Sequence, residues 1–221
     1  MAPQLALIFD VDGTIVNNMP YHLKAWGKLI AELGSDLKGD ELLKQLYGKN
    51  EEVLKRIFGK RFSEDELHKL SLRKEEYYRE LYLPHMQLVP GVLEFLEDAK
   101  QHGVAMAIGT ASMKINLDLL LHGLHIHEFF KVVISAEDVT KSKPDPETFL
   151  IAAQRLNMEP RHCIVFEDVP KGVEAAANGS MKCIVVTTNH RSEEFEPYKN
   201  IIRFIEDFRG LKVEEIRMQM R

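Results

Sequence analysis

The chain has 221 residues, of which 45% are hydrophobic and 29% charged, and its 29 basic against 34 acidic residues give a net charge of −5. These proportions are ordinary for a globular protein with one large domain, or with a core domain and a smaller insertion. The acidic balance and the lack of any basic tract argue against nucleic acid as the main partner.

The first segment, MAPQLALIFD, has no positively charged n-region, and its apolar run meets an aspartate within a few residues. We therefore expect neither a signal peptide nor a membrane anchor there, and no membrane partner. The apolar residues Leu5–Phe9 predict a first buried strand. After it, the sequence from about residue 18 to 85 has the apolar spacing and composition of helices only, which is far longer than an ordinary connection between a strand and a helix.

Four more apolar runs follow, and each predicts a short strand buried on both faces: Val104–Ile108, Val132–Ile134, Cys163–Phe166 and Cys183–Val186. Continuous apolarity of this kind is typical of a parallel sheet covered by helices. Amphipathic helices are predicted between most of them: Val92–Gln101, Pro146–Leu156 and Lys171–Asn178. The repetition of strand and helix predicts a doubly wound, Rossmann-like α/β core. Both cysteines lie in such strands, so we expect reduced structural thiols and a cytoplasmic protein.

These patterns divide the chain into two predicted domains. Residues 1–16 and 89–221 form the α/β core, and residues 17–88 form an inserted, all-helical cap domain. A last helix is expected from Val213 onward, packed on the surface of the core.

The first predicted strand ends in FDVDGT, which places Asp10, Asp12 and Thr14 at its carboxyl edge, where open α/β sheets bind ligands. Two carboxylates one residue apart repel each other when both are ionised, so a cation or a shared proton is expected. One of them can then serve as nucleophile or metal ligand while the other holds a proton. A simpler alternative is a turn, because Asp-Gly pairs are common turn formers.

Two further motifs carry groups suited to an anion. In IGTAS, Thr110 and Ser112 follow a predicted strand, and the small residues there let backbone amides approach an anion, although such residues also cap helices. In KSKPDPETF, Lys143 precedes a proline that fixes the chain, so its ammonium can lie near a phosphate and near Asp10. Lys141 is the less constrained neighbour and is expected to be solvated.

Another predicted strand ends in VFEDVPKG, which supplies Glu167 and Asp168. Magnesium prefers a few carboxylates together with water and substrate phosphate, so this pair provides ligands opposite the first strand. The alternative is a solvated loop acid and a helix cap. After the last predicted strand, His190 and Arg191 are candidates for reaching the mouth of the site.

In this order, FDVDGT, GTAS, KSKP and FEDV resemble the motifs of the haloacid dehalogenase superfamily of phosphotransferases, and the resemblance covers essentially the whole chain. It implies that Asp10 is a nucleophile that forms an aspartyl-phosphate. It implies that Asp12 is the general acid/base, with its backbone carbonyl on the metal.

The same resemblance gives a phosphate-binding hydroxyl to Thr110 and a charge-neutralising ammonium to Lys143. It implies Mg²⁺ as the cofactor, and its expected ligands are Asp10, Asp12, Glu167 and Asp168. The lysine, the cation and backbone donors would spread the charge of the transferring phosphoryl group.

Within the superfamily, the chain is similar to the β-phosphoglucomutase-like branch and its phosphatase relatives with a helical cap. The segment MPYHLKAW gives His22 and Trp26 counterparts that act there in gating and at the cap–core interface, and Lys74 in LRKEEYY falls on a matching cap position. The alternative for the first two is ordinary helix packing. The other charges of RKEEYYRE are expected to form a solvated face.

Two departures favour hydrolysis over isomerisation. The mutases grip a second phosphate with a cap-loop arginine, whereas YGKNEEVL offers Lys49, which lacks the bidentate fork. The mutases also carry valine where this chain has Thr14, whose hydroxyl could orient Asp12. The expected substrate-binding residues are Thr14, His22, Trp26, Lys49, Lys74 and Ser112.

The sequence therefore predicts a magnesium-dependent phosphatase for a small phosphorylated metabolite, such as a sugar phosphate. One alternative is a β-phosphoglucomutase-like isomerase that interconverts β-glucose 1-phosphate and glucose 6-phosphate. A non-catalytic binding module is disfavoured because every expected acid and the lysine are present. No motif encodes the phosphate ester or the oligomeric state.

Overall fold

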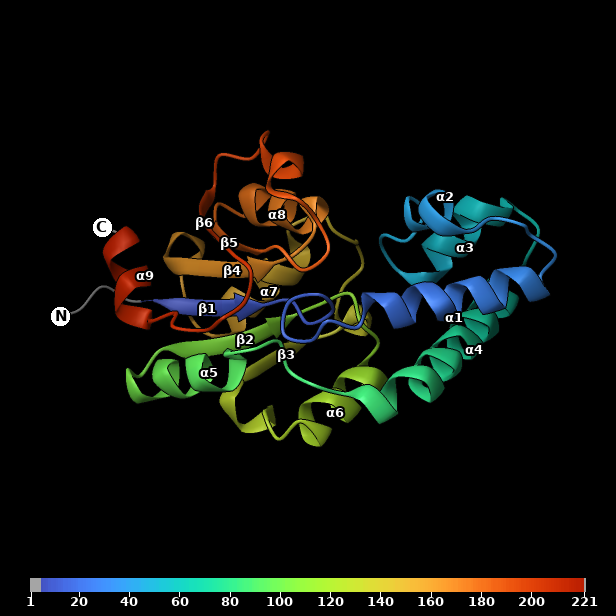
Figure 1. Cartoon of the computed structure of the whole chain (residues 1–221). Coiled ribbons are helices and arrows are strands. Elements are labelled where there is room, and N and C mark those ends of the chain that lie inside the picture. The colour runs from blue at the N-terminus through green and yellow to red at the C-terminus, as the bar shows by residue number, and fades with distance from the viewer. Residues whose placement is uncertain (1–4, 221) are drawn as a thin grey trace. The chain divides into compact units, whose positions relative to one another are not determined.

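The computed structural model describes residues 5–220, and the chain folds into two compact units (Figure 1). The sheet unit contains the residues up to 17 and from 87 onward, and the helical unit contains residues 18–86. We expect that the first segment, MAPQLALIFD, is not a signal peptide. Its first four residues lie outside the described range.

Within residues 5–220, six strands form one parallel sheet in the order β3-β2-β1-β4-β5-β6. This topology confirms the predicted doubly wound α/β fold. The strands are β1 Ala6–Phe9, β2 Ala105–Gly109, β3 Val132–Ile134, β4 Cys163–Glu167, β5 Lys182–Val186 and β6 Ile201–Ile205. The five predicted strands are found within a residue of their expected ends.

The sixth strand was not predicted, and its burial pattern explains why. None of its residues is fully buried, and Phe204 is 42% exposed. An edge strand with one neighbour lacks the continuous apolar run that identifies a central parallel strand. Arg203 in its middle forms an ion pair with Glu215 at 2.6 Å, so the strand contributes a polar side chain to the surface.

Helices cover the two faces of the sheet. On one face, α7 (Glu147–Arg155) packs against β1, β2 and β3, and α8 (Pro170–Asn178) packs against β4 and β5. Helix α5 (Val92–Gln101) packs against β2 and against the last helix, α9 (Val213–Gln219) (Figure 1). Helix α6 (Lys114–Gly123) connects β2 to β3. Short 3-10 turns η2 to η5 lie at His127–Phe129, Ala136–Asp138, Pro160–His162 and Ser192–Phe195.

An aromatic cluster stabilises the middle of the sheet beneath the strand ends. Phe9 and Phe166 pair in the parallel register, and their rings stack with centroids 4.6 Å apart. Phe95 of α5 and Phe208 pack on both of them. Full burial of such a side chain contributes about 1.5–3 kcal/mol. The residues that follow β1 and β4 are therefore attached to a tightly packed, rigid part of the sheet.

The helical unit contains α1 (Met19–Glu32), α2 (Gly39–Leu43), α3 (Asn50–Phe58), α4 (Glu64–Tyr82) and the turn η1 (Leu83–His85). Helix α4 begins at a capping box, in which Ser63 N–H donates to Glu66 Oε2 at 2.8 Å. Helices α1 and α4 pack together, and Trp26, Leu29 and Leu54 belong to the apolar core of this unit. The role of residues 17–88 as a cap domain stays a prediction.

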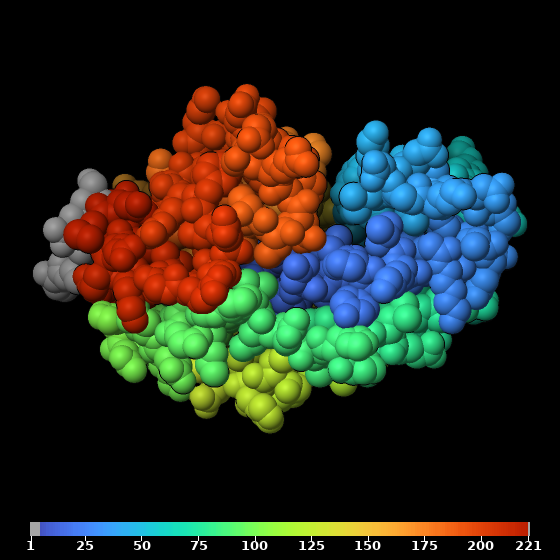
Figure 2. All heavy atoms as spheres, viewed as in Figure 1, coloured from blue at the N-terminus to red at the C-terminus, as the bar shows by residue number. Residues whose placement is uncertain are grey.

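Figure 2 shows the segment that follows β5 (orange to red) on the surface of the sheet unit. A search of residues 5–220 finds no helix with the length and apolarity needed to span a membrane. Cys163 and Cys183 are buried and form no disulfide, as the sequence predicts.

Candidate active site

Two acidic side chains meet where β1 and β4 end. The parallel register pairs Phe9 with Phe166, so the next residues, Asp10 and Glu167, lie beside each other at the carboxyl edge of the sheet. The Asp10 N–H donates to the Phe166 carbonyl at 3.0 Å, which extends the ladder by one step. The side chain of Asp10 is nearly buried and that of Glu167 is completely buried. The predicted meeting of the two strand ends therefore has a direct cause in strand register.

Lys143 joins these two carboxylates. Its ammonium lies 2.7 Å from Asp10 Oδ1 and 2.6 Å from Glu167 Oε1, and it also donates to the Gly109 carbonyl at 3.3 Å. Only 9% of the lysine side chain is exposed. A buried ammonium needs such partners, because water is not available to solvate it. The side chain of Lys141, as expected, is 71% exposed, and its ammonium pairs with Asp145.

The carboxylate of Glu167 is held by the backbone as well. Its Oε2 accepts from the N–H groups of Asp168 at 2.9 Å and Val169 at 3.1 Å. The space that it occupies exists because residue 172, in the first turn of α8, is glycine. A Cβ there would lie 1.8 Å from Glu167 Oε1.

We expect Gly172→Ala to destabilise the protein by about 1–3 kcal/mol, the usual cost of inserting a methyl group into a filled site. Gly27→Ala is the matched control, because a Cβ at this position in α1 meets no atom within 4 Å, and alanine favours the helix. Urea denaturation of both variants measures the difference. Equal stability of the two variants would contradict the close contact.

Asp168 is the third buried acid of the site, with 1% of its surface exposed. Thr14 Oγ1 donates to its Oδ1 at 3.4 Å, and Asn189 Nδ2 donates to its Oδ2 at 3.0 Å. Gly13 lies against the same carboxylate with a φ of +84°, and a Cβ there would lie 2.0 Å from Asp168 Oδ2. Only glycine combines this backbone conformation with this close approach. The expected contact of Thr14 with Asp12 stays a prediction.

Asp10, Glu167 and Asp168 fit a divalent cation. One carboxylate oxygen from each lies within 4.8 Å of the others, and all three residues are buried. Magnesium binds hard oxygen ligands of this kind. Three carboxylates against the single ammonium of Lys143 also leave an excess of two negative charges among these four groups when all are ionised, which a divalent cation would neutralise. The side chain of Asp12 is not in this group, and its expected contribution through the backbone carbonyl stays a prediction.

Burial, together with the excess of negative charge, raises the pKa values of two of these acids. Burial raises the pKa of Asp10 from 3.8 to about 7; Lys143 opposes this shift, and Glu167 and Asp12 add to it. Burial also raises the pKa of Asp168 well above its ordinary value, and the charges of Glu167 and Asp10 act in the same direction. For Lys143, burial lowers the pKa, but the two carboxylates outweigh it and raise the pKa above its ordinary value. A bound cation would take the place of these protons.

The loop after β2 contributes hydroxyl groups beside Asp12. Ser112 Oγ donates to Asp12 Oδ2, and Ser112 N–H donates to Thr110 Oγ1 at 3.2 Å. Thr110 is 1% exposed, and its N–H donates to the Ile134 carbonyl at 3.0 Å, which ties the loop to β3. The structure thus brings Ser112, predicted as a substrate contact, to the predicted acid/base. The roles of these residues toward phosphate stay predictions.

The helical unit contains a separate buried polar cluster. Lys74 Nζ lies 2.7 Å from His22 Nδ1 and 2.8 Å from Glu75 Oε1, and Asn50 Nδ2 donates to that same oxygen at 2.6 Å. Burial raises the pKa of Glu75, but Lys74 and His22 lower it to a net value below the ordinary one. The lysine ammonium also lies over the Trp26 ring, 5.4 Å from its centroid. Lys74 therefore contacts two other predicted cap residues, His22 and Trp26.

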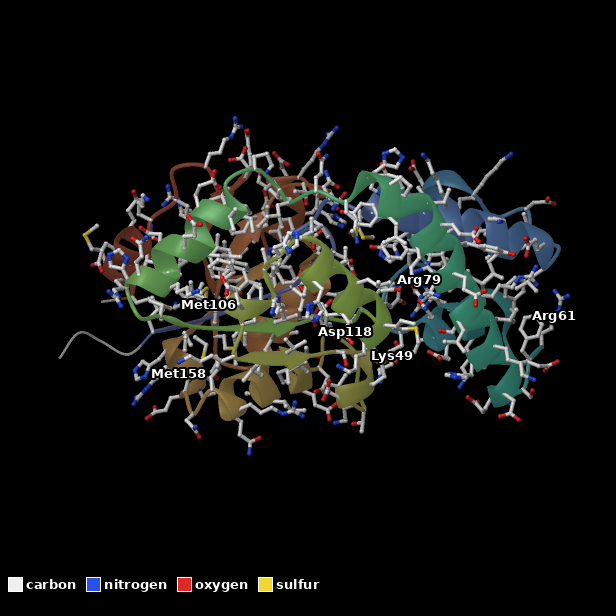
Figure 3. All side chains as sticks on the ribbon, turned by 90° about the horizontal axis from the view of Figure 1, so that it is seen from below. Lys49, Arg61, Arg79, Met106, Asp118 and Met158 are labelled. Atoms are coloured by element: carbon white, nitrogen blue, oxygen red, sulfur yellow. The ribbon has the colours of Figure 1, made fainter. Side chains whose placement is uncertain are left out.

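The expectation of a solvated RKEEYYRE face is wrong for Glu75, which is only 3% exposed. Its carboxylate neutralises Lys74 inside the unit, so this lysine is not an uncompensated positive charge. Lys49 is half-buried and precedes α3, and Figure 3 shows it and Arg61 on opposite sides of the helical unit. Arg56 of α3 donates to the backbone carbonyls of Gln45 and Tyr47.

The sequence did not single out Asn189. The candidates that we infer from the sequence for the mouth of the site are His190 and Arg191. In the structure, His190 Nδ1 pairs with Glu194 at 2.9 Å, and the Arg191 N–H donates to the same glutamate. Both precede η5, and Arg191 is its N-cap residue. The signal that could have identified Asn189 is the run of polar residues Thr187 to Asn189 directly after β5, because the carboxyl ends of adjacent parallel strands lie together.

Comparisons with known proteins agree with this geometry. A family model described as haloacid dehalogenase-like hydrolase matches residues 7–186. Fructose-1-phosphate phosphatase YqaB of Escherichia coli is 31% identical over 182 residues, which cover 81% of this chain and 95% of that protein. The chloroplastic 5-amino-6-(5-phospho-D-ribitylamino)uracil phosphatase of Arabidopsis thaliana is 29% identical over 92% of this chain, which spans only 55% of that protein's length.

Among solved structures, a β-phosphoglucomutase from Clostridium difficile superimposes with a TM-score of 0.86 and 30% identity, covering 98% of this chain and 97% of that one. Both of the relatives described above are named as phosphatases, so hydrolysis is favoured over isomerisation. The family match extends over more than half of the residues and includes all four motifs. The chain therefore belongs to the haloacid dehalogenase-like hydrolases.

Proposed function

We propose that this chain is a magnesium-dependent phosphatase that hydrolyses the phosphate monoester of a small phosphorylated metabolite through an aspartyl-phosphate on Asp10. The observation that carries the proposal is the contact of Asp10 with Lys143 beside two further buried acids at the carboxyl edge of the sheet. A nucleophilic carboxylate needs nearby positive charge before a phosphate dianion can approach it.

The reaction would proceed in two steps. An oxygen of Asp10 attacks phosphorus and the ester bond breaks, while Asp12 gives its proton to the leaving alcohol. Asp12 then takes a proton from water as the water oxygen attacks the phosphorus of the aspartyl-phosphate. The bond between phosphorus and the Asp10 oxygen breaks, which releases inorganic phosphate and regenerates the Asp10 carboxylate. Lys143 and the hydroxyl of Thr110 bind the phosphoryl oxygens in both steps.

Asp10, Glu167 and Asp168, with the carbonyl of Asp12, would hold Mg²⁺. When bound, the cation supplies positive charge that stabilises the transferring phosphoryl group. Lys143 holds the carboxylates of Asp10 and Glu167, and the N–H groups of Asp168 and Val169 also hold Glu167, so the site is organised before substrate arrives. Preorganised charge of this kind is usually the largest contribution to catalysis.

The proposed substrate class is the phosphate ester of a sugar or sugar alcohol. Two relatives support it, because their names describe phosphatases of fructose 1-phosphate and of a phosphoribityl compound. We propose that the helical unit acts as the cap domain, with His22, Trp26, Lys49 and Lys74 as its substrate contacts. The two buried thiols are consistent with a reducing, cytoplasmic location.

Removal of divalent metal tests the proposal. We expect purified protein treated with a chelator to release no phosphate from a panel of phosphorylated sugars and polyols, and added Mg²⁺ to restore release. Inorganic phosphate and isomeric sugar phosphates are measured in the same reactions. Phosphate release that persists in chelator would contradict the proposed cofactor. Conversion of β-glucose 1-phosphate to glucose 6-phosphate faster than phosphate release would identify a mutase instead.

A further inference from the structure

The loop that follows the carboxyl end of β5 extends toward Asp168 in the acidic site. Strand β5 lies next to β4 in parallel, so their carboxyl ends are adjacent. Thr187 N–H donates to the Ile205 carbonyl at 2.8 Å, and this bond fixes the start of the loop on β6. Thr188 Oγ1 then donates to the Gly13 carbonyl in the turn after β1. The loop is therefore anchored on both sides before residue 189.

Asn189 uses this anchored position to hold Asp168. Its Nδ2 donates to Asp168 Oδ2 at 3.0 Å and to Thr188 Oγ1 at 3.2 Å. On the other side of the contact, a Cβ on Gly13 would lie 2.0 Å from Asp168 Oδ2 and 2.7 Å from Asn189 Nδ2. The Asn189 amide and the Asp168 carboxylate are thus packed together against the turn at Gly13. This packing and the hydrogen bond restrict the orientation of the carboxylate.

The second oxygen of Asp168 has a weaker restraint. Thr14 Oγ1 reaches Oδ1 at 3.4 Å, which is long for a hydroxyl donor. Asn189 is therefore the stronger side-chain donor of the two. Groups that hydrogen-bond a metal-binding carboxylate fix its direction, and their loss typically costs tenfold to a hundredfold in metal affinity.

We propose that Asn189 is a positioning residue that holds the Asp168 carboxylate in the orientation in which it shares a divalent cation with Asp10 and Glu167. This inference rests on the proposed metal site. Asn189 contacts neither substrate nor metal in this role and acts only through Asp168. Thr188 supports it by fixing the loop to the carbonyl of Gly13.

Titration of the full chain with Mg²⁺ by calorimetry tests the role directly, without turnover. We expect Asn189→Leu, which keeps a similar volume but has no donor, to bind Mg²⁺ about tenfold more weakly than the wild type. In assays of phosphate release, the variant should need a higher Mg²⁺ concentration for half-maximal activity. Its kcat should largely recover at saturating Mg²⁺. Asn189→Ser, whose side chain is too short to reach Asp168, should behave alike and serves if the leucine variant does not fold.

Asn200→Ala is the matched control. The amide of Asn200 donates to the carbonyls of Val173 and Met181 at 3.2 Å, in the same unit, and does not contact the acidic residues. We expect this variant to lose stability but keep its Mg²⁺ affinity. Equal affinities of wild type and Asn189 variants, or an equal loss in the Asn200 variant, would overturn the positioning role alone. A wild type that binds no Mg²⁺ would overturn the proposed metal site together with it.

Discussion

Asp10→Asn will reduce the kcat of phosphate release by at least about 10⁴-fold, in line with the losses that follow removal of the nucleophile in other enzymes. The amide has almost the same shape as the carboxylate, so the variant keeps the packing at the end of β1. Its amide oxygen carries no negative charge and is too weak a nucleophile to attack phosphorus. The measurement is phosphate release from the best substrate of the panel, at saturating Mg²⁺.

The stability of this variant separates lost chemistry from lost folding. The pKa of Asp10 is about 7 in the folded protein against an ordinary 3.8, so the folded state binds more protons than the unfolded state between these values. In the absence of metal, wild-type stability therefore falls as pH rises from about 4 to about 7 through this group. The Asn variant escapes this loss, and we expect it to be more stable than metal-free wild type at pH 8 and similar near pH 4.

Asp98→Asn provides a control, because the pKa of Asp98 is shifted in the opposite direction to that of Asp10. Burial raises the pKa of Asp98, but the Val213 N–H and Lys212 outweigh it and hold the pKa below its ordinary value. Its carboxylate therefore stabilises the fold at neutral pH, and this stabilisation is lost as the pH falls through the folded pKa. The control should lose stability at pH 8 and keep its activity. A fully active Asp10→Asn enzyme would contradict the nucleophilic role.

The parts of the site that the sequence predicts correctly follow from periodicity and topology. Continuous apolar runs identify the central strands, and parallel strands bring their carboxyl ends to one edge of the sheet. Asp10 and Glu167 had to lie close together once β1 and β4 were neighbours. The predicted nearness of Lys143 to Asp10 is likewise found at 2.7 Å, because the lysine precedes α7, which packs on β1.

The remaining features depend on side-chain pairing, which periodicity does not encode. The second bond of Lys143, to Glu167, requires the loop before α7 and the first turn of α8 to have particular conformations. The contact of Asn189 with Asp168 joins residues from different strand ends through a loop whose path has no sequence signature. Glu75 belongs to a run of charges typical of a solvated face, and its burial becomes favourable only because Lys74 and Asn50 contact its carboxylate.

Lys143→Met will abolish most activity and will also destabilise the sheet unit, by about 3–5 kcal/mol at pH 8 without metal, the cost of removing one partner from a buried ion pair. Methionine fills a similar volume but leaves Asp10 and Glu167 facing each other without the ammonium. Lys141→Met is the control, because that side chain is 71% exposed and its loss should change stability by less than about 0.5 kcal/mol.

The pH dependence of the Lys143→Met defect identifies its cause. Without the ammonium the buried carboxylates bind protons more tightly in the folded state, so the stability of the variant must fall as pH rises and recover as pH falls. We expect a large difference in melting temperature from wild type at pH 8 and a small one at pH 5. Adding Asp10→Asn to this variant removes one of the opposed charges and should restore part of the stability, a coupling that a double-mutant cycle measures. A defect that is the same at both pH values would mean that lost packing, and not uncompensated charge, destabilises the variant.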